Sequence, residues 1–355
     1  MRKLNLLFVV AGTLAVPMSA QVPAAKPVHH YVFFGGDRDG IKDAKSLLDN
    51  PNIEGAQVIY TWRLLEQGRD GYEFAPIREN LELLAAHGKK LWIQLQDVSF
   101  DPNRINVPQY LLNNPIYHGG AAKQYEIPGQ DESRAVHSGW VARRWDPAVQ
   151  ERFQKLLMAL GKEFDGKIAG INLPETAIVF GSGSLFPEGF SHDAYRQAIV
   201  VNMKALKAAF PKSVTMQYAN FVPGEWRPDE DKGYLSGVYA AARSLGVGVG
   251  GPDLMPHRPG QLKSSYPLIH EYAGSIPTGI AVQDGNLAQI NPETGKPVTA
   301  EELLKFATGY LNVDYIFWGM EEPYYSRDVL PLLARLKKNQ RQSLVIMKSG
   351  APSNS

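Results

Sequence analysis

Eight apolar, strand-like runs alternate with helix-like segments along this chain, and that alternation constrains the fold more than any other feature. The runs are continuously apolar rather than alternating in polarity, which is typical of parallel strands covered on both faces. Eight such strands are the number that closes a (β/α)8 barrel. The runs are residues 31–36, 55–62, 90–97, 168–180, 214–221, 246–256, 278–286 and 313–323.

The pattern therefore predicts an α/β fold, a single-domain (β/α)8 TIM barrel over residues 28–340 with a long loop after the third strand. A doubly wound open sheet is the alternative. It would need a glycine-rich phosphate-binding turn after the first strand, and "FFGGDRDG" at residues 33–40 matches that fingerprint poorly.

Helix signals occur between most of the strands. Asp146 and Pro147 are suited to the N-cap and first position of one helix, and Thr299 with Glu302 forms a capping-box pattern for another. Residues 98–145 lack clear periodicity, and a segment of that length is usually functional or disordered. Its aromatic residues favour an ordered, functional segment; they are Tyr110, Tyr117, Tyr125, Trp140 and Trp145.

The N-terminus predicts export. Arg2 and Lys3 precede an apolar stretch, residues 4–16, that is short for a membrane span, and small residues such as Ala20 and Ala24 follow. We expect residues 1–24 to be a cleaved signal peptide of a secreted or periplasmic protein without stable membrane insertion afterwards; a retained anchor is the alternative. Residues 341–355 are expected to form a disordered tail.

Composition excludes several functions. The chain has no cysteine, which excludes disulfides, thiolate catalysis and cysteine-ligated zinc. The formal net charge of +1 gives no reason to expect a nucleic-acid partner. There is no phosphate loop, no G-x-S-x-G motif, and no H-x-H or H-E-x-x-H pair among the eight histidines, so no cofactor or metal is expected.

The ends of the predicted strands carry the residues of a carbohydrate site. In such barrels the chemistry lies at the carboxyl ends of the strands. Amides and carboxylates hydrogen-bond hydroxyl groups, and aromatic faces stack on sugar rings, so an oligo- or polysaccharide substrate is expected. The candidate residues are Trp62, Gln96, Asn172, Glu175, Tyr218, Asn220, Asp253, Gln283, Asp284, Trp318 and Glu321.

Three segments resemble the clan A glycoside hydrolases. They are "GINLPETA" at residues 170–177, the segment 145–171 that leads into it, and "YIFWGMEEP" at residues 315–323. The resemblance implies a barrel with a catalytic acid/base glutamate ending the fourth strand, here Glu175. It also implies a tryptophan floor ending the eighth strand, here Trp318.

The chain departs from that family's pattern in two places. Leu173 and Pro174 separate Asn172 from Glu175, although the family has them adjacent. Strict alternation then directs Asn172 and Glu175 to opposite faces unless Pro174 introduces a bulge. The seventh strand, "AVQDGN", ends without the family's second glutamate, and Asp284 is the nearest carboxylate.

The resulting hypothesis is a two-carboxylate glycosidase. Glu175 is the general acid/base and Asp284 the nucleophile or base, with Asp253, Glu321 or Glu322 as other sources of the second carboxylate. Side chains expected to contact the sugar are Trp62, Gln96, Asn172, Tyr218, Asn220, Asp253, Gln283, Trp318, Glu321 and, as a further platform, Trp140.

Two other functions remain open. The first is a barrel that binds glycans without cleaving them, which the missing strand-seven glutamate favours. The second is a metal-dependent hydrolase or lyase, which requires His257 or His137 to converge with Asp253 or Asp284.

Overall fold

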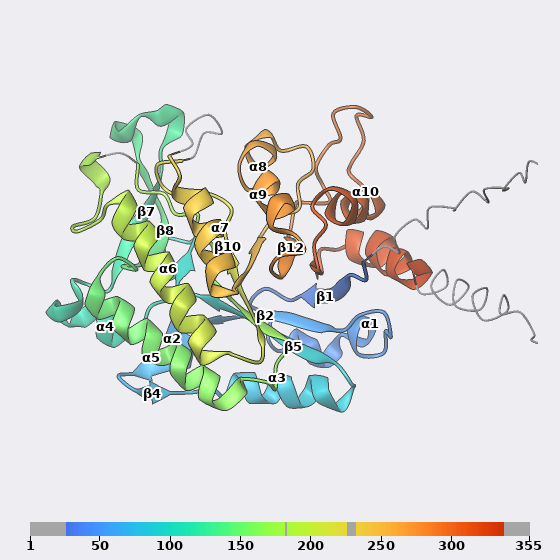
Figure 1. Cartoon of the computed structure of the whole chain (residues 1–355), viewed down its shortest axis with the longest axis horizontal. Helices are drawn as coiled ribbons and strands as arrows, with labels where there is room; N and C mark the ends of the chain where they lie inside the picture. Colours follow the sequence, from blue (N-terminus) through green and yellow to red (C-terminus); the bar gives the residue numbers. More distant parts are fainter. Residues whose placement is uncertain (1–25, 182, 226–231, 337–355) are drawn as a thin grey trace, which may run out of the picture.

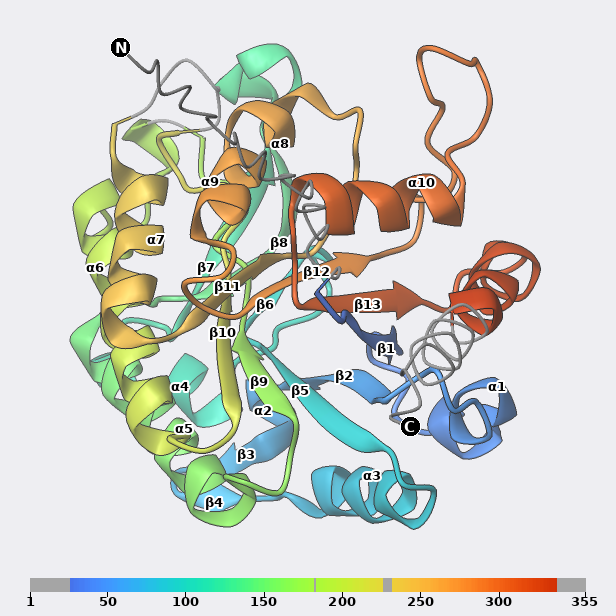
Figure 2. The same cartoon turned by 45° about the vertical axis from the view of Figure 1, so that its right-hand side comes forward.

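The structure, a computed structural model, describes residues 26–181, 183–225 and 232–336. The predicted signal peptide and the predicted tail lie outside these residues. Eight parallel strands form a closed barrel, as predicted, and helices surround it (Figures 1 and 2). The strands are β1 (His29–Phe33), β2 (Gly55–Thr61), β5 (Lys90–Gln96), β9 (Gly170–Leu173), β10 (Val214–Tyr218), β11 (Gly248–Gly251), β12 (Thr278–Val282) and β13 (Tyr315–Gly319).

Each barrel strand pairs with the strands before and after it in the chain, and β1 closes the ring against β13. The fold is therefore a (β/α)8 TIM barrel rather than the alternative open sheet. Seven of the predicted runs contain one strand of the barrel, and the first, residues 31–36, overlaps β1, which begins two residues earlier. The carboxyl ends of the strands consequently meet on one face, where the predicted site residues follow.

Helices flank the barrel at most of the expected places. They are α1 (Lys45–Leu48), α2 (Trp62–Leu65), α3 (Ala75–Ala86), α4 (Gln109–Asn113), α5 (Pro147–Phe164), α6 (His192–Ala209), α7 (Tyr234–Leu245), α8 (Pro259–Lys263), α9 (Ser265–Tyr272), α10 (Ala300–Lys305), which continues as the π-helix η6 (Phe306–Tyr310), and the π-helix η7 (Tyr325–Val329). The Asp146 N-cap and the Thr299–Glu302 capping box are both present. Helices α8 and α9 were not expected, because their segments are short and interrupted by Pro259 and Pro267.

The barrel interior is filled by large side chains opposite glycines. Tyr31, Trp92, Met216, Tyr218, Ala281 and Phe317 form this inner cluster. A Cβ atom on Gly250 would lie 2.5 Å from the Gly279 carbonyl oxygen and 2.9 Å from the Met216 sulfur. Gly250 and Gly279 thus leave room for the Met216 side chain from β10 and, at Gly279, for Phe317 from β13, and the barrel is a packed core rather than a channel.

The segment after the third barrel strand is more regular than the predicted loop. It contains an antiparallel sheet of β6 (Val98–Ser99), β8 (Val136–Ala142) and β7 (Ala121–Glu126), in that order. The backbone N–H of Tyr125 donates to the carbonyl of Val179, which lies just beyond the fourth barrel strand. This insertion is therefore attached to the segment that carries Glu175. Within the described ranges, no helix combines the length and apolar character that crossing a bilayer requires.

Candidate active site

Glu175 follows the fourth barrel strand on an irregular segment. Strand β9 ends at Leu173, and the chain leaves the ladder at Pro174, so strict alternation no longer decides where Glu175 points. The Glu175 side chain is partly buried. The two residues between Asn172 and Glu175 therefore do not force the glutamate onto the opposite face, because the strand ends before it.

The environment of the Glu175 carboxyl extends its protonated form from acidic pH up to about neutral pH. Burial raises its pKa to about 7; the hydrogen bond from Asn220 opposes this rise, the negative charge of Asp253 adds to it, and the charge of Arg144 opposes it. Asn220 donates from Nδ2 to Glu175 Oε2 over 2.7 Å. A carboxyl that titrates near neutrality is suited to giving and taking a proton.

Arg144 does not neutralise Glu175. Its guanidinium binds both oxygens of Asp97, at 2.9 and 2.6 Å, and donates to the backbone carbonyl of Glu175 rather than to its carboxylate. In the part of the chain that the structure describes, no salt bridge reaches the Glu175 carboxylate. The interpretation of Glu175 as one half of a structural ion pair with Arg143 or Arg144 therefore receives no support.

Asp253 is the carboxylate whose charge acts on Glu175. It follows β11, is partly buried, and accepts a hydrogen bond from Asn286 Nδ2 at 3.1 Å. The amide oxygen of Asn286 in turn accepts from the backbone N–H groups of Leu254 and Gln283. The buried Asn286 therefore holds the loops after β11 and β12 together and orients Asp253.

Asp284 lies in an exposed turn after β12, and Gln283 beside it is partly buried. The next residue, Gly285, has a φ of +84°, which glycine adopts without strain. Glu321 accepts a hydrogen bond from the Gly285 backbone N–H at 2.9 Å. Glu321 thus joins the turn to the end of β13, and Glu322 is exposed and bonded to Ser326.

The two tryptophans predicted as sugar platforms lie in the core. Trp62 packs against Phe153 and donates from its indole nitrogen to Glu66 at 2.8 Å. Trp318 is fully buried and donates to Nδ1 of His30, whose pKa is lowered to about 4 by burial and by neighbouring His29. The prediction for both is wrong, because each side chain is enclosed and presents no face to a ligand. Trp140, the further platform, lies partly exposed in β8 beside His137.

Asn172 and Tyr218 also lie inside the barrel rather than at its rim. The Asn172 amide oxygen accepts from Gln57 Nε2 at 3.1 Å and from the Trp92 indole at 3.0 Å. The Tyr218 hydroxyl accepts from the same Gln57 nitrogen at 2.8 Å. Both residues are fully buried, so they organise the barrel interior and do not contact a substrate.

Gln96 is the polar residue of the third barrel strand that remains at the rim. Its side chain is partly buried, and its amide oxygen has no hydrogen-bond partner among the described residues. Gln94, two residues earlier on the same face, has an unpartnered amide oxygen as well. Buried acceptors without partners are uncommon. Gln94 is buried beside Asn172, so of the two only Gln96, with its partly exposed side chain, lies where a ligand could meet it. Gln94 was not predicted; the alternation Trp92, Gln94, Gln96 along β5 is the signal that identifies it.

Metal ligation receives no support from the described residues. No group of three or more histidines, aspartates or glutamates lies close enough to hold an ion within them. His137 contacts the carbonyl of Gly139 within its own strand.

The site thus contains Glu175, Asn220 and Asp253, with Gln96, Gln283 and Glu321 following other strand ends. Asp97 and Asn286 also follow strand ends, and Arg144 is a possible ion-pair partner of Glu175, but the sequence assigns none of the three a role in the site. The only feature of the sequence that points to these residues is that each lies within a few residues of a strand end or a helix N-cap. The contacts that connect them to the site join residues far apart in the chain: Arg144 binds Asp97 and the Glu175 carbonyl, 47 and 31 positions away, and Asn286 binds Asp253, 33 positions away.

No protein-family model matches this chain, and the curated proteins contain no match. Among solved structures, a β-galactosidase from Bacillus circulans sp. alkalophilus aligns with a TM-score of 0.52 at 10% identity, covering 82% of this chain and 50% of that one. The chain therefore spans about half the length of that structure. The catalytic domain of a β-amylase from Paenibacillus polymyxa aligns at 12% identity, covering 84% of this chain and 93% of that chain, with a TM-score of 0.45.

An endo-glycoceramidase II from Rhodococcus sp. aligns at 11% identity, covering 84% of this chain and 74% of that chain, with a TM-score of 0.46. At these identities, the likeness to the β-galactosidase bears on the fold alone: this chain has the (β/α)8 barrel architecture that a known glycoside hydrolase also uses.

Proposed function

We propose that this protein is a glycoside hydrolase in which Glu175 is the general acid. The observation that carries the proposal is the Glu175 carboxyl itself: it follows the fourth barrel strand, forms no salt bridge with any described residue, and has a pKa raised to about 7. A neutral carboxylic acid at the catalytic face of a TIM barrel can protonate the oxygen of a departing sugar.

Asp253 is the second carboxylate of this proposal. Its charge raises the pKa of Glu175, so the two groups are close enough to interact through a partly buried environment. Asn286 holds one of its oxygens and leaves the other available. Two carboxyl groups with different roles are what glycosidases need: here Glu175 is the acid, and Asp253 acts as nucleophile or as base for a water. Asp284, in its exposed turn, is the competing candidate.

The substrate is proposed to be an oligo- or polysaccharide. Gln96 supplies an amide oxygen that has no partner among the described residues, Gln283 and Glu321 lie after the seventh and eighth strands, and the antiparallel insertion is attached beside Glu175. The barrel's likeness to a structure named β-galactosidase supports this class of substrate. On the sequence pattern of residues 1–24, we propose that the protein is exported to the periplasm or the exterior.

The test is hydrolysis of a panel of polysaccharides and aryl glycosides by the wild type and four variants. Glu175→Gln and Asp253→Asn are each expected to lose about 10³-fold or more in kcat while still binding product. Asp284→Asn is expected to stay near the wild type. Glu293→Gln, which changes an exposed carboxylate in the loop after the seventh strand, is the matched control and should have no effect.

The outcomes separate the parts of the proposal. Full activity in Glu175→Gln rejects the acid role and the proposal with it. If Asp284→Asn is inactive and Asp253→Asn is active, Asp284 is the second catalytic carboxylate. The anomeric configuration of the first product, followed by NMR, then distinguishes a retaining from an inverting enzyme.

A barrel that binds glycans without cleaving them is the second candidate. It is favoured by the exposed turn after β12, which carries Asp284 where a buried glutamate is expected for this class of barrel. Binding of a polysaccharide without release of any product, by wild type and Glu175→Gln alike, would support this candidate.

A further inference from the structure

The backbone that carries Glu175 is held by three side-chain donors in succession. Gln217 donates to the carbonyl of Pro174 at 2.7 Å, Arg144 to that of Glu175 at 2.9 Å, and Tyr195 to that of Thr176 at 2.9 Å. The donors come from β10, from the segment after β8, and from α6, and all three are buried. Three consecutive peptides are thus fixed from three directions.

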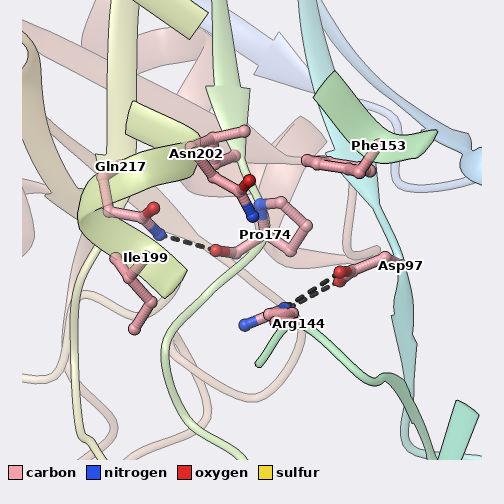
Figure 3. Close-up of a pocket in the computed structure, with 8 residues that line it drawn as sticks. Asp97, Arg144, Phe153, Pro174, Ile199, Asn202 and Gln217 are labelled. Atoms are coloured by element: carbon pink, nitrogen blue, oxygen red, sulfur yellow. Dashed lines mark hydrogen bonds and ion pairs between the residues drawn. The ribbon is translucent and has the colours of Figure 1, made fainter. Parts of the chain in front are cut away.

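A small cavity lies behind this segment. Its lining includes Asp97, Arg144, Pro174, Gln217, Phe153 of α5 and Asn202 of α6 (Figure 3). The hydrogen bonds from Gln217, Arg144 and Tyr195 lie around this cavity and hold the three carbonyls of residues 174–176 in place.

Arg144 is the centre of this arrangement. Its Nε and Nη2 bind the two oxygens of Asp97 at the end of β5, and its Nη1 donates both to the Glu175 carbonyl and to the Tyr195 hydroxyl, at 2.7 Å in the latter case. Figure 3 shows the bidentate pair of Arg144 and Asp97. A lysine cannot reproduce this pattern, since only the planar fork reaches Asp97 twice and still donates in a third direction.

The pair of Arg144 and Asp97 also affects the electrostatic environment of the Glu175 carboxyl. Five groups face or adjoin it: Asn220 after β10, Asp253 after β11, Arg144 after β8, Tyr195 of α6, and Asp97 behind Arg144. A buried cation without a counter-ion so close to Glu175 would favour the ionised carboxylate. Pairing with Asp97 limits this effect: Arg144 still lowers the pKa of Glu175, but its charge is the smallest of the four contributions to that pKa.

We propose that Arg144, paired with Asp97, is a positioning residue for Glu175: it fixes the peptide of the acid and leaves the carboxyl free to hold and transfer its proton. This inference rests on the proposed function. It assigns the positioning role to hydrogen bonds on the backbone. It therefore predicts a loss of kcat per folded molecule, whereas an ion pair that only stabilises the fold would affect stability alone.

The first test compares Arg144→Lys, which keeps the charge and loses the fork, with Arg152→Lys. Arg152 is the matched control, because it is an equally buried arginine paired with Glu66, away from Glu175. Per folded molecule, Arg144→Lys is expected to lose about 10²-fold in kcat with little change in KM, since a displaced catalytic group has this effect. In the Glu175→Gln background the same change should add no further loss. Wild-type kcat in folded Arg144→Lys overturns the inference.

Tyr195→Phe is the milder variant if the lysine variant does not fold. It removes the donor to the Thr176 carbonyl and should reduce kcat by roughly tenfold. An unchanged kcat there would also count against the inference.

The second test needs no substrate. The titration of Glu175 is followed by ¹³C NMR of the carboxyl carbon, assigned by its absence in Glu175→Gln. In the neutral double variant Asp97→Asn/Arg144→Gln the midpoint should move to higher pH, because Arg144 is the nearer charge; in Arg152→Lys it should not move. An unmoved midpoint in the double variant rejects the inference. A moved midpoint in a protein that cleaves nothing rejects the proposed function instead.

Discussion

Replacing Glu175 by glutamine should stabilise the protein, and the gain should depend on pH in a defined window. Folding raises the pKa of this carboxyl from 4.5 to about 7, chiefly because burial disfavours its charged form. The native state then binds more protons than the unfolded state between these two values, so the stability of the wild type falls as pH rises through this range. At about 1.4 kcal/mol per unit of pKa, the loss is on the order of 3 kcal/mol.

The measurement is the free energy of unfolding in urea, for wild type and Glu175→Gln, from pH 4.5 to 8.5. Glutamine is neutral throughout and can still accept the hydrogen bond from Asn220. The difference between the two proteins should therefore rise by about 3 kcal/mol up to pH 7 and stay level above it. Constant offsets caused by the substitution cancel in this comparison. A difference that does not change with pH would refute the raised pKa, and with it the argument for Glu175 as the acid.

Three further predictions follow from the contacts of the site and the barrel. Asp253→Asn removes a charge that raises the pKa of Glu175, so the NMR titration of Glu175 should move to lower pH; an unmoved titration would show that the two carboxyls do not interact. Trp318→Phe loses the buried bond to His30 and should cost about 1 kcal/mol in urea unfolding with kcat unchanged, whereas a lower kcat per folded molecule would return Trp318 to the site. Thr299→Ala disrupts a complete capping box and should lower the urea midpoint by an amount equivalent to about 1 kcal/mol at constant m-value; no change would mean that this helix end does not depend on its cap.

Local sequence determined the elements of this fold. Continuous apolar runs marked all eight barrel strands, and the N-cap at Asp146 and the capping box at Thr299 marked two helix starts correctly. These signals depend on neighbouring residues in the chain, so a single sequence contains them. Glu175 was placed after the fourth strand by the same reasoning, because the end of an apolar run is itself a local feature.

The tertiary structure alone decided which strand-end residues face the site. Trp62 and Trp318 look like platforms in the sequence, yet the barrel encloses them; Asp253 resembles an ordinary turn residue, yet its charge acts on Glu175. The pairing of Asp97 with Arg144 likewise joins residues 47 positions apart. The physical reason is that burial and electrostatic coupling depend on how eight strands close into a ring, whereas the strands themselves depend only on hydrophobic pattern.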